Sequence, residues 1–306
     1  MQKKEIDLSI IIISLSTEKY NSKDNLEVAL KTLKPALKKI KSEVILVNNS
    51  TTEDGTFNMA KSYIADIIFL KRDKLYQFGD NNNFGLKKAK GKYVLFLNND
   101  IKFLDSNILK EMISWMDNNP KVAVSSCALL NEDEKTLQGS GGYFPDLIKV
   151  VSWMTFLDDL PILNKIFDSY HPNLDYFKKP HKQDWVTGAF YLVRKDVLDI
   201  SGGFDLDYNA YVEETDLSYR ISKLGYDTWY LPKWKIVHFG GQSYGTENSI
   251  IFEMKNLKIF YSKHYPKWQL PILSFVLKFG CLLRIIVFSL FKPDLVKIYA
   301  KAIKTI

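Results

Sequence analysis

The feature that most constrains the fold is an alternation of apolar runs and helical patterns over the first hundred residues. Helical patterns span about 24–40, where Pro35 predicts a kink or break, and 80–90, where Asp80 is expected to cap the helix and Gly91 to end it. Strands buried on both faces and separated by single helices predict parallel βαβ units and a mostly parallel, doubly wound α/β sheet. The apolar runs are DLSIIIIS (7–14), EVILVNN (43–49), DIIFL (66–70) and KYVLFLNND (92–100).

Small polar side chains follow three of these runs. In a doubly wound sheet the ligand lies beyond the carboxyl ends of the strands, so these clusters mark the expected binding edge. No GxGxxG follows the first run and no GxxxxGK[ST] occurs, which argues against a dinucleotide dehydrogenase and a P-loop NTPase. The clusters are Ser14-Leu15-Ser16, Asn48-Asn49-Ser50 and Asn98-Asn99-Asp100.

The second half is less regular, and its pattern predicts one catalytic domain. The segment 130–182 is rich in turns and aromatic residues, has no dominant period, and is interpreted as an excursion that shapes a pocket. The other predicted elements are a helix over 105–118 stopped by Pro120, a strand over 121–130, a strand leading into a helix over 184–198, a helix over 214–225 ended by Gly225, and two short strands within 227–241.

Positive charge is concentrated at the C-terminal end. The net charge is +7, and residues 251–306 alone hold ten Lys and Arg against two acids, a balance of +8, so the preceding residues sum to −1. A nearly neutral body argues against nucleic-acid binding, which requires basic residues over a globular face. The two cysteines, Cys127 and Cys281, provide neither a disulfide framework nor a cysteine zinc site, and favour a reducing, cytoplasmic compartment.

The basic tail encloses an apolar stretch over 268–291. Lys278 and Arg284 interrupt it, so it lacks the roughly 18 uncharged residues of a spanning helix. At 100° per residue Ser274, Lys278, Ser289 and Lys292 share one stripe, with Arg284 on its flank and apolar residues elsewhere. This pattern favours an amphipathic helix lying on the anionic inner face of the cell membrane. A core helix or a homodimer interface is the alternative.

Four segments resemble the family 2 glycosyltransferases, in particular the rhamnosyltransferase-like bacterial members. The resemblance spans about 8–245 and implies a GT-A fold. It divides the chain into a catalytic domain over 1–245, with a nucleotide-binding half over about 1–101 and an acceptor half over about 102–245, and a helical tail over 246–306. The segments are VNNSTTEDGT (47–56), FGDNNNFGLKKAKGKYVLFLNND (78–100), WVTGAFYLVRKDVLDISGGFD (185–205) with YVEETDLSYRISKLGYDTWYLP (211–232), and VHFGGQS (237–243).

The resemblance implies transfer of a sugar from a nucleoside-diphosphate donor, dTDP-rhamnose or a UDP-hexose, to a hydroxyl of a glycan or lipid-linked glycan in bacterial surface polysaccharide synthesis. A divalent cation, Mn²⁺ or Mg²⁺, suits the charge that develops on the departing diphosphate. Asp100, with Asn98 two residues before it, offers one carboxylate, and the resemblance supports His238 as a second ligand.

A general base must accept the proton of the attacking hydroxyl. Carboxylates suit a helix start, and Glu213, Glu214 and Asp216 are candidates there. The resemblance places the family's catalytic Asp at Glu214, one methylene longer, while Glu213 and Asp216 are expected to brace the site, for instance through Arg220. Because no candidate nucleophile for a covalent intermediate is evident, the anomeric configuration is expected to invert.

Donor and acceptor recognition fall to the remaining strand ends and loops. Asn48 stands where the family has an acid, so the nucleobase of the donor is left open. Trp185 suits either stacking on a sugar or packing in the core. Two alternatives remain: a sugar-nucleotide nucleotidyltransferase, although 14–24 lacks the glycines of a triphosphate loop, and a catalytically inactive nucleotide-binding membrane scaffold. The predicted donor residues are Ser14, Asn48, Asn49, Asn83, Asn98, Asn99 and Asp100, and the acceptor or sugar-pocket residues are Trp185, Gly188, Ala189, Glu213 and Asp216.

Overall fold

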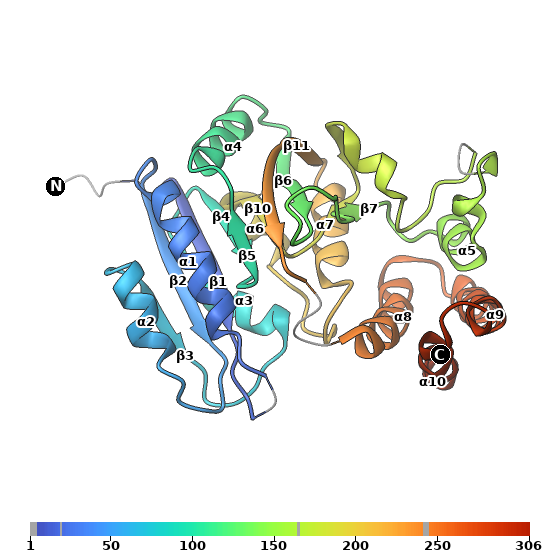
Figure 1. Cartoon of the computed structure of the whole chain (residues 1–306). Helices are drawn as coiled ribbons and strands as arrows, with labels where there is room; N and C mark the ends of the chain where they lie inside the picture. The colour runs from blue at the N-terminus through green and yellow to red at the C-terminus, as the bar shows by residue number, and fades with distance from the viewer. Residues whose placement is uncertain (1–4, 19, 164–165, 241–244) are drawn as a thin grey trace.

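The protein is described by a computed structural model over residues 5–18, 20–163, 166–240 and 245–306. Within these residues the main sheet has nine strands in the order β3-β2-β1-β4-β10-β6-β11-β5, with β8 also paired to β11, and β7 pairs with β9 separately (Figure 1). The strands are β1 (Leu8–Ser14), β2 (Ser42–Asn48), β3 (Ile68–Lys71), β4 (Tyr93–Leu97), β5 (Ile101–Phe103), β6 (Val122–Leu130), β7 (Gly141–Gly142), β8 (His181–Gln183), β9 (Trp185–Val186), β10 (Phe190–Arg194) and β11 (Asp227–His238).

Helices cover both faces of this sheet. The helices of the described residues are α1 (Lys23–Leu37), α2 (Thr56–Tyr63), α3 (Phe78–Leu86), α4 (Ile108–Asp117), α5 (Leu147–Thr155), α6 (Lys195–Ser201), α7 (Glu213–Lys223), α8 (Gly245–His264), α9 (Gln269–Ser289) and α10 (Pro293–Thr305), with short 3₁₀ turns η1 (Leu157–Asp159) and η3 (Leu174–Lys178). Along β1, Ile10 and Ile12 join the core beneath α1 and α4, whereas Ile11 joins the core beneath α6 and α7. The unbroken apolar run of β1 follows from this double coverage.

The predicted strands of the first half are confirmed, and the helices differ in detail. α1 continues through Pro35 and ends at Leu37, and α2 was not predicted. α3 starts after Gln77 and ends at Leu86, well before Gly91. Asp80 lies inside its first turn and pairs with Arg72 (Nη2–Oδ1 2.6 Å), so the predicted capping role is wrong.

Beyond β4 the sheet is mixed. β3, β2, β1 and β4 run parallel, β10 is antiparallel to both β4 and β6, and β6 is parallel to β11. β11 is one long strand where two short strands were predicted. Its register against β6 shifts between Leu231 and Lys235, because Pro232 within this interval has no N–H for the ladder.

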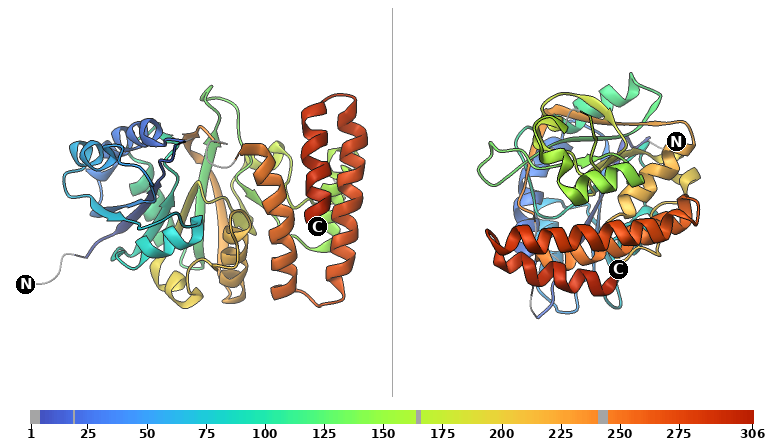
Figure 2. Two further views of the ribbon diagram at one scale, coloured as in Figure 1. Left: turned by 90° about the horizontal axis from the view of Figure 1, so that it is seen from below. Right: turned by 90° about the vertical axis from the view of Figure 1, so that its right-hand side faces the viewer.

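The excursion and the C-terminal helices fold together. Figure 2 shows α8, α9 and α10 side by side at the end of the molecule farthest from β1, β2 and β3. Val150 and Met154 of α5 share one apolar core with residues of all three helices. Gly280 of α9 lies so close to α5 that an added Cβ would be 2.5 Å from Met154 Cε, which explains the lack of a side chain there.

Arg284 lies inside this assembly and not beside a polar surface stripe. It is 5% exposed and donates to the carbonyl oxygens of Met154 and, at 2.6 Å, Trp153, which belong to the last turn of α5. Those carbonyls have no partner within their own helix, so the guanidinium satisfies them. The expectation that Arg284 lies on the flank of an exposed polar stripe is therefore wrong.

Candidate active site

A cavity of about 260 Å³ opens beyond the carboxyl ends of β1 and β4, the edge where the polar strand ends were expected to gather. Its walls come from the segment after β4, the start of α3, the residues before β10, the start of α7 and the end of β11. Asp100 and Glu214, far apart in sequence, share it. The predicted residues that line it are Asn49, Asn98, Asn99, Asp100, Gly188, Ala189, Glu213, Glu214 and His238.

Asp100 and His238 form one wall. His238 Nε2 lies 3.4 Å from Asp100 Oδ1 and 3.3 Å from Asn98 Nδ2. Gln138 fixes the imidazole: its Nε2 donates to the His238 carbonyl at 2.6 Å, so its Oε1 accepts from His238 Nδ1 at 2.8 Å. In the neutral ring this assigned tautomer leaves the Nε2 lone pair facing Asp100.

These side chains fit a divalent cation that is shared with a phosphate-bearing ligand. A carboxylate oxygen suits Mg²⁺ or Mn²⁺, and an imidazole nitrogen suits Mn²⁺. Over the described residues, no group of three or more His, Cys, Asp or Glu side chains could hold a metal ion by itself. Oxygens of a bound diphosphate would complete the coordination, as is common for Mg²⁺.

The opposite wall begins with a strained turn. Tyr211 and Val212 have φ values of 66° and 73°, a left-handed conformation that costs a β-branched residue on the order of 1–3 kcal/mol. Asn256 of α8 holds this turn by donating from Nδ2 to the carbonyls of Ala210 (2.6 Å) and Tyr211 (2.8 Å). The turn starts α7 so that both Glu213 and Glu214 line the cavity.

The two carboxyl groups influence each other's protonation. Burial raises the pKa of Glu214 to about 7, with a further increase from the nearby Glu253 carboxylate and a partial offset from backbone hydrogen bonds. Burial and the charge of Glu214 raise the pKa of Glu213 further above its usual range. Oε2 of Glu213 has no hydrogen-bond partner in the described part of the chain. Glu214 is therefore suited to accept a proton near neutral pH.

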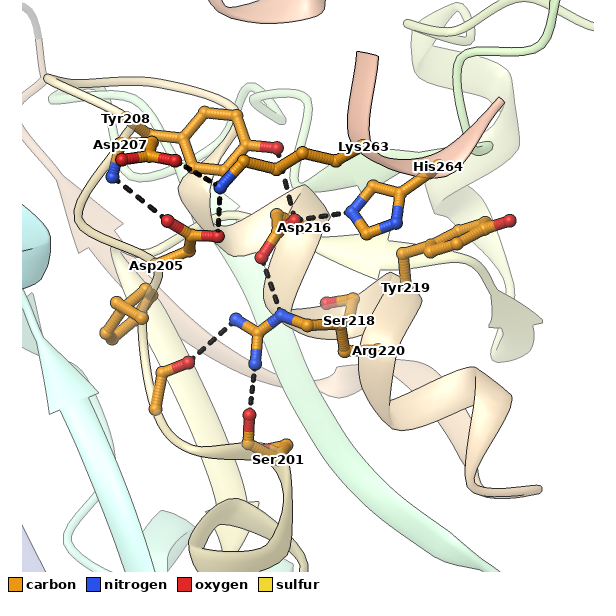
Figure 3. Close-up of polar contacts among 12 residues, drawn as sticks. Ser201, Asp205, Asp207, Tyr208, Asp216, Ser218, Tyr219, Arg220, Lys263 and His264 are labelled. Carbon is orange, nitrogen blue, oxygen red and sulfur yellow. Dashed lines mark hydrogen bonds and ion pairs between the residues drawn. The ribbon is translucent and has the colours of Figure 1, made fainter. Parts of the chain in front are cut away.

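Asp216 does not line the cavity. Its side chain instead contacts Tyr208, Arg220 and His264, which come from three segments (Figure 3). Its wholly buried carboxylate accepts hydrogen bonds from Tyr208 Oη (3.1 Å), His264 Nε2 (2.6 Å) and Arg220 Nε (2.7 Å). Burial opposes ionisation, but the His264 and Arg220 contacts outweigh it and lower the pKa of Asp216. Arg220 also donates to the Gly203 carbonyl at 2.7 Å, which links α7 to the turn that follows α6. The His264–Asp216 contact links α7 to α8.

Several predicted residues lie outside this cavity. Asn83 is directed toward Phe204, where it donates to the carbonyl (2.7 Å) and accepts from the N–H (2.9 Å), so its side chain does not line the cavity. Asn48 Oδ1 accepts from the Ser50 N–H at 3.0 Å, and Ser14 is fully buried. Trp185 lines a second, adjoining cavity. Residues 241–243 of the VHFGGQS segment lie outside the described residues.

Asn81 lines the cavity and was not singled out in the sequence. Its Nδ2 donates to the Tyr76 carbonyl at 3.0 Å, while its buried Oδ1 has no partner among the described residues. Tyr76 and Phe78 add aromatic surface beside it. The run of three asparagines at 81–83 could have indicated this residue, because α3 begins at Phe78 and its first turn lies at the carboxyl ends of the strands.

Comparison with known proteins gives one family and one fold. The profile described as "Glycosyl transferase family 2" matches residues 10–190. The O-antigen biosynthesis protein RfbC of Myxococcus xanthus is 26% identical over 197 residues, which are 64% of this chain and 15% of that protein. The rhamnosyltransferase WbbL of Escherichia coli is 27% identical over 179 residues, 54% of this chain and 61% of WbbL. The chain therefore spans only part of each relative.

Among solved structures, the mannosyltransferase PcManGT from Pyrobaculum calidifontis, in complex with GDP-Man and Mn²⁺, matches 98% of this chain and 86% of its own with a TM-score of 0.58 and 16% identity. This likeness concerns the fold alone. It confirms the expected GT-A architecture with a central mixed sheet. The match also extends over the C-terminal helices, because it covers nearly the whole chain.

Proposed function

The chain belongs to glycosyltransferase family 2, and from that premise we propose that it is an inverting enzyme that transfers a sugar from a nucleoside-diphosphate donor to a hydroxyl of a glycan or lipid-linked glycan. The observation that carries the proposal is the shared cavity, with Asp100 and His238 on one wall and Glu214 on the other. dTDP-rhamnose is the preferred donor, with a UDP-hexose as the alternative, because WbbL is named a rhamnosyltransferase. The name of RfbC, an O-antigen biosynthesis protein, supports a role in bacterial surface polysaccharide synthesis.

Each wall has its own task in this proposal. Asp100 and His238 would hold Mn²⁺ or Mg²⁺, which neutralises the charge of the departing diphosphate. Asn49, Asn81 and Asn99 supply polar contacts along the donor side of the cavity. Glu214 accepts the proton of the acceptor hydroxyl as that oxygen attacks the anomeric carbon. A direct displacement inverts the anomeric configuration, so a product that retains the donor's configuration would contradict the proposal.

A ligand screen followed by turnover tests the function. We expect dTDP or UDP with Mn²⁺ to raise the apparent melting temperature of the full chain, because a ligand that binds only the folded state stabilises it. The corresponding nucleotide sugar is then expected to be hydrolysed slowly in the absence of acceptor, with release of the diphosphate. Binding without any turnover would favour the inactive scaffold, and GMP serves as the control for nonspecific nucleotide effects.

We further propose that the enzyme works on the inner face of the cell membrane, docked through α9. This helix is, in the described ranges, the one long and apolar enough to cross a membrane by length and composition alone, and 33% of its apolar window is buried inside the protein. Lys278 is exposed on the same helix beside the outward-facing apolar side chains, where it can reach anionic headgroups. The large apolar side chains exposed on this helix and at its ends include Trp268, Ile272, Phe275, Phe279, Leu282, Ile286 and Leu290.

Vesicle binding tests this docking face. Replacing both Phe275 and Phe279, 68% and 49% exposed, with serine should weaken sedimentation with phosphatidylglycerol-containing vesicles by roughly 100-fold, because two apolar side chains no longer enter the bilayer. Ile200→Ser, at an exposed apolar residue of α6, is the matched control and should bind like the wild type. If the wild type does not bind vesicles and light scattering detects dimers, the exposed face of α9 is an interface between two copies of the chain.

A further inference from the structure

A second cavity of about 220 Å³ adjoins the first. The two have Thr187, Tyr211 and Glu214 in common, so the carboxyl group of Glu214 stands at their boundary. No metal-ligand candidate from the first cavity lines the second. Its own walls come from the excursion, from β9, from the start of α7 and from the C-terminal helix α8.

The second cavity is both aromatic and charged. Trp185 lines it beside Tyr170, whose ring centre lies 5.5 Å away, and the Trp185 indole N–H donates to the Tyr143 carbonyl at 3.0 Å. His171 and Glu253 form a hydrogen-bonded pair in the same wall, with 2.6 Å between Nε2 and Oε1. The Glu253 side chain is only 18% exposed, although it belongs to the basic tail. Its carboxylate is therefore directed inward.

This combination suits a pyranose ring. Aromatic surfaces pack against the C–H faces of sugars, and a carboxylate with an imidazole offers acceptors and a donor for ring hydroxyls. An in-line reaction requires the incoming hydroxyl to approach the anomeric carbon from the side opposite the departing diphosphate. In the proposed function Asp100 and His238 mark the diphosphate side, and neither of them lines the second cavity, which meets the first at Glu214.

We propose that the second cavity is the acceptor subsite, which binds a sugar ring of the acceptor through the His171–Glu253 pair, and that α8 is thereby part of the active site. This inference rests on the proposed function, because it requires Glu214 to take the proton of a bound hydroxyl. Glu253 also acts on that step at a distance: its charge contributes to the raised pKa of Glu214. The titratable groups whose charges interact with Glu214 are Glu213 on the same helix, His171 of the excursion and Glu253 of α8.

Glycoside binding to the full-length protein tests the subsite. The probes are octyl glycosides of glucose, galactose, N-acetylglucosamine and rhamnose, measured by saturation-transfer NMR with dTDP and Mn²⁺ present. We expect the wild type to bind at least one of them, and Glu253→Gln and His171→Asn each to weaken that binding at least fivefold. Glu247→Gln, on the exposed side of the same helix where it pairs with Lys301, is the matched control and should bind like the wild type.

Two further measurements separate the possible failures. Nucleotide binding should stay within twofold of the wild type in both variants, because neither residue lines the first cavity, and melting temperatures report folding. If the wild type binds none of the glycosides, or if both folded variants bind them as the wild type does, the acceptor subsite is overturned. If the wild type neither binds nucleotide nor hydrolyses any donor, the proposed function itself fails.

Discussion

Glu214→Gln is expected to lower the rate of sugar transfer about 10²- to 10⁴-fold while leaving nucleotide binding unchanged. Glutamine has nearly the same shape as glutamate but cannot accept the proton of the attacking hydroxyl, and general bases contribute about this factor. Initial rates with donor and acceptor give the transfer rate, and calorimetric titration with dTDP or UDP gives the binding. Glu132→Gln, at an exposed residue, should retain wild-type activity.

The pH profile provides an independent check on the same residue. Because the pKa of Glu214 is raised to about 7, the carboxyl group is protonated below that pH and cannot act as a base. The rate of transfer should fall about tenfold per pH unit below pH 7 and level off above it. Glu214→Gln should remove this dependence. An acid limb near pH 4, or a folded Glu214→Gln protein with wild-type rates, would assign the base elsewhere.

Asp100→Asn is expected to reduce metal-dependent donor turnover about 10²- to 10³-fold. The site offers one carboxylate and one imidazole, and loss of the carboxylate removes the stronger ligand and several kcal/mol of charge stabilisation. The half-saturating Mn²⁺ concentration should rise accordingly. Electron paramagnetic resonance of Mn²⁺ in the presence of dTDP measures binding of the ion directly, apart from activity.

Asp66→Asn, at an exposed acid, is the control for the change of net charge. It should bind Mn²⁺ and turn over donor as the wild type does. The proposal that Asp100 holds the cation is refuted if Asp100→Asn binds Mn²⁺ with unchanged affinity, or if the wild type is fully active in EDTA.

The sheet and the position of the cavity were predictable because they depend on local patterns. Four apolar runs gave four strands, and the polar residues after β4 lie in the cavity since parallel strands present their carboxyl ends at one edge. The approach of Glu214 and His238 to Asp100 could not follow from periodicity. It depends on β10 and β11 joining the sheet from distant parts of the sequence, and only the motif resemblance indicated it.

Other residues could not be placed because their roles depend on which side of an element faces the ligand. Asn83 and Asn81 are two residues apart in one helical turn, so they face different neighbours: one binds the Phe204 backbone and the other lines the cavity. Arg284 illustrates the same problem in the tail. A helical projection gives its angle around α9, but only the packing of α5 against that helix determines that this side is buried.

The contact between Arg284 and the end of α5 has a consequence for anyone who exchanges parts between related proteins. If the C-terminal helices of this protein were replaced alone by those of a relative, the Trp153 and Met154 carbonyls would lose Arg284 as their donor. Met154 would also pack against a residue other than Gly280, where there is no room for a side chain. A chimera should therefore transfer residues 147–156 together with the C-terminal helices, because these two segments, although distant in sequence, pack together as one structural unit.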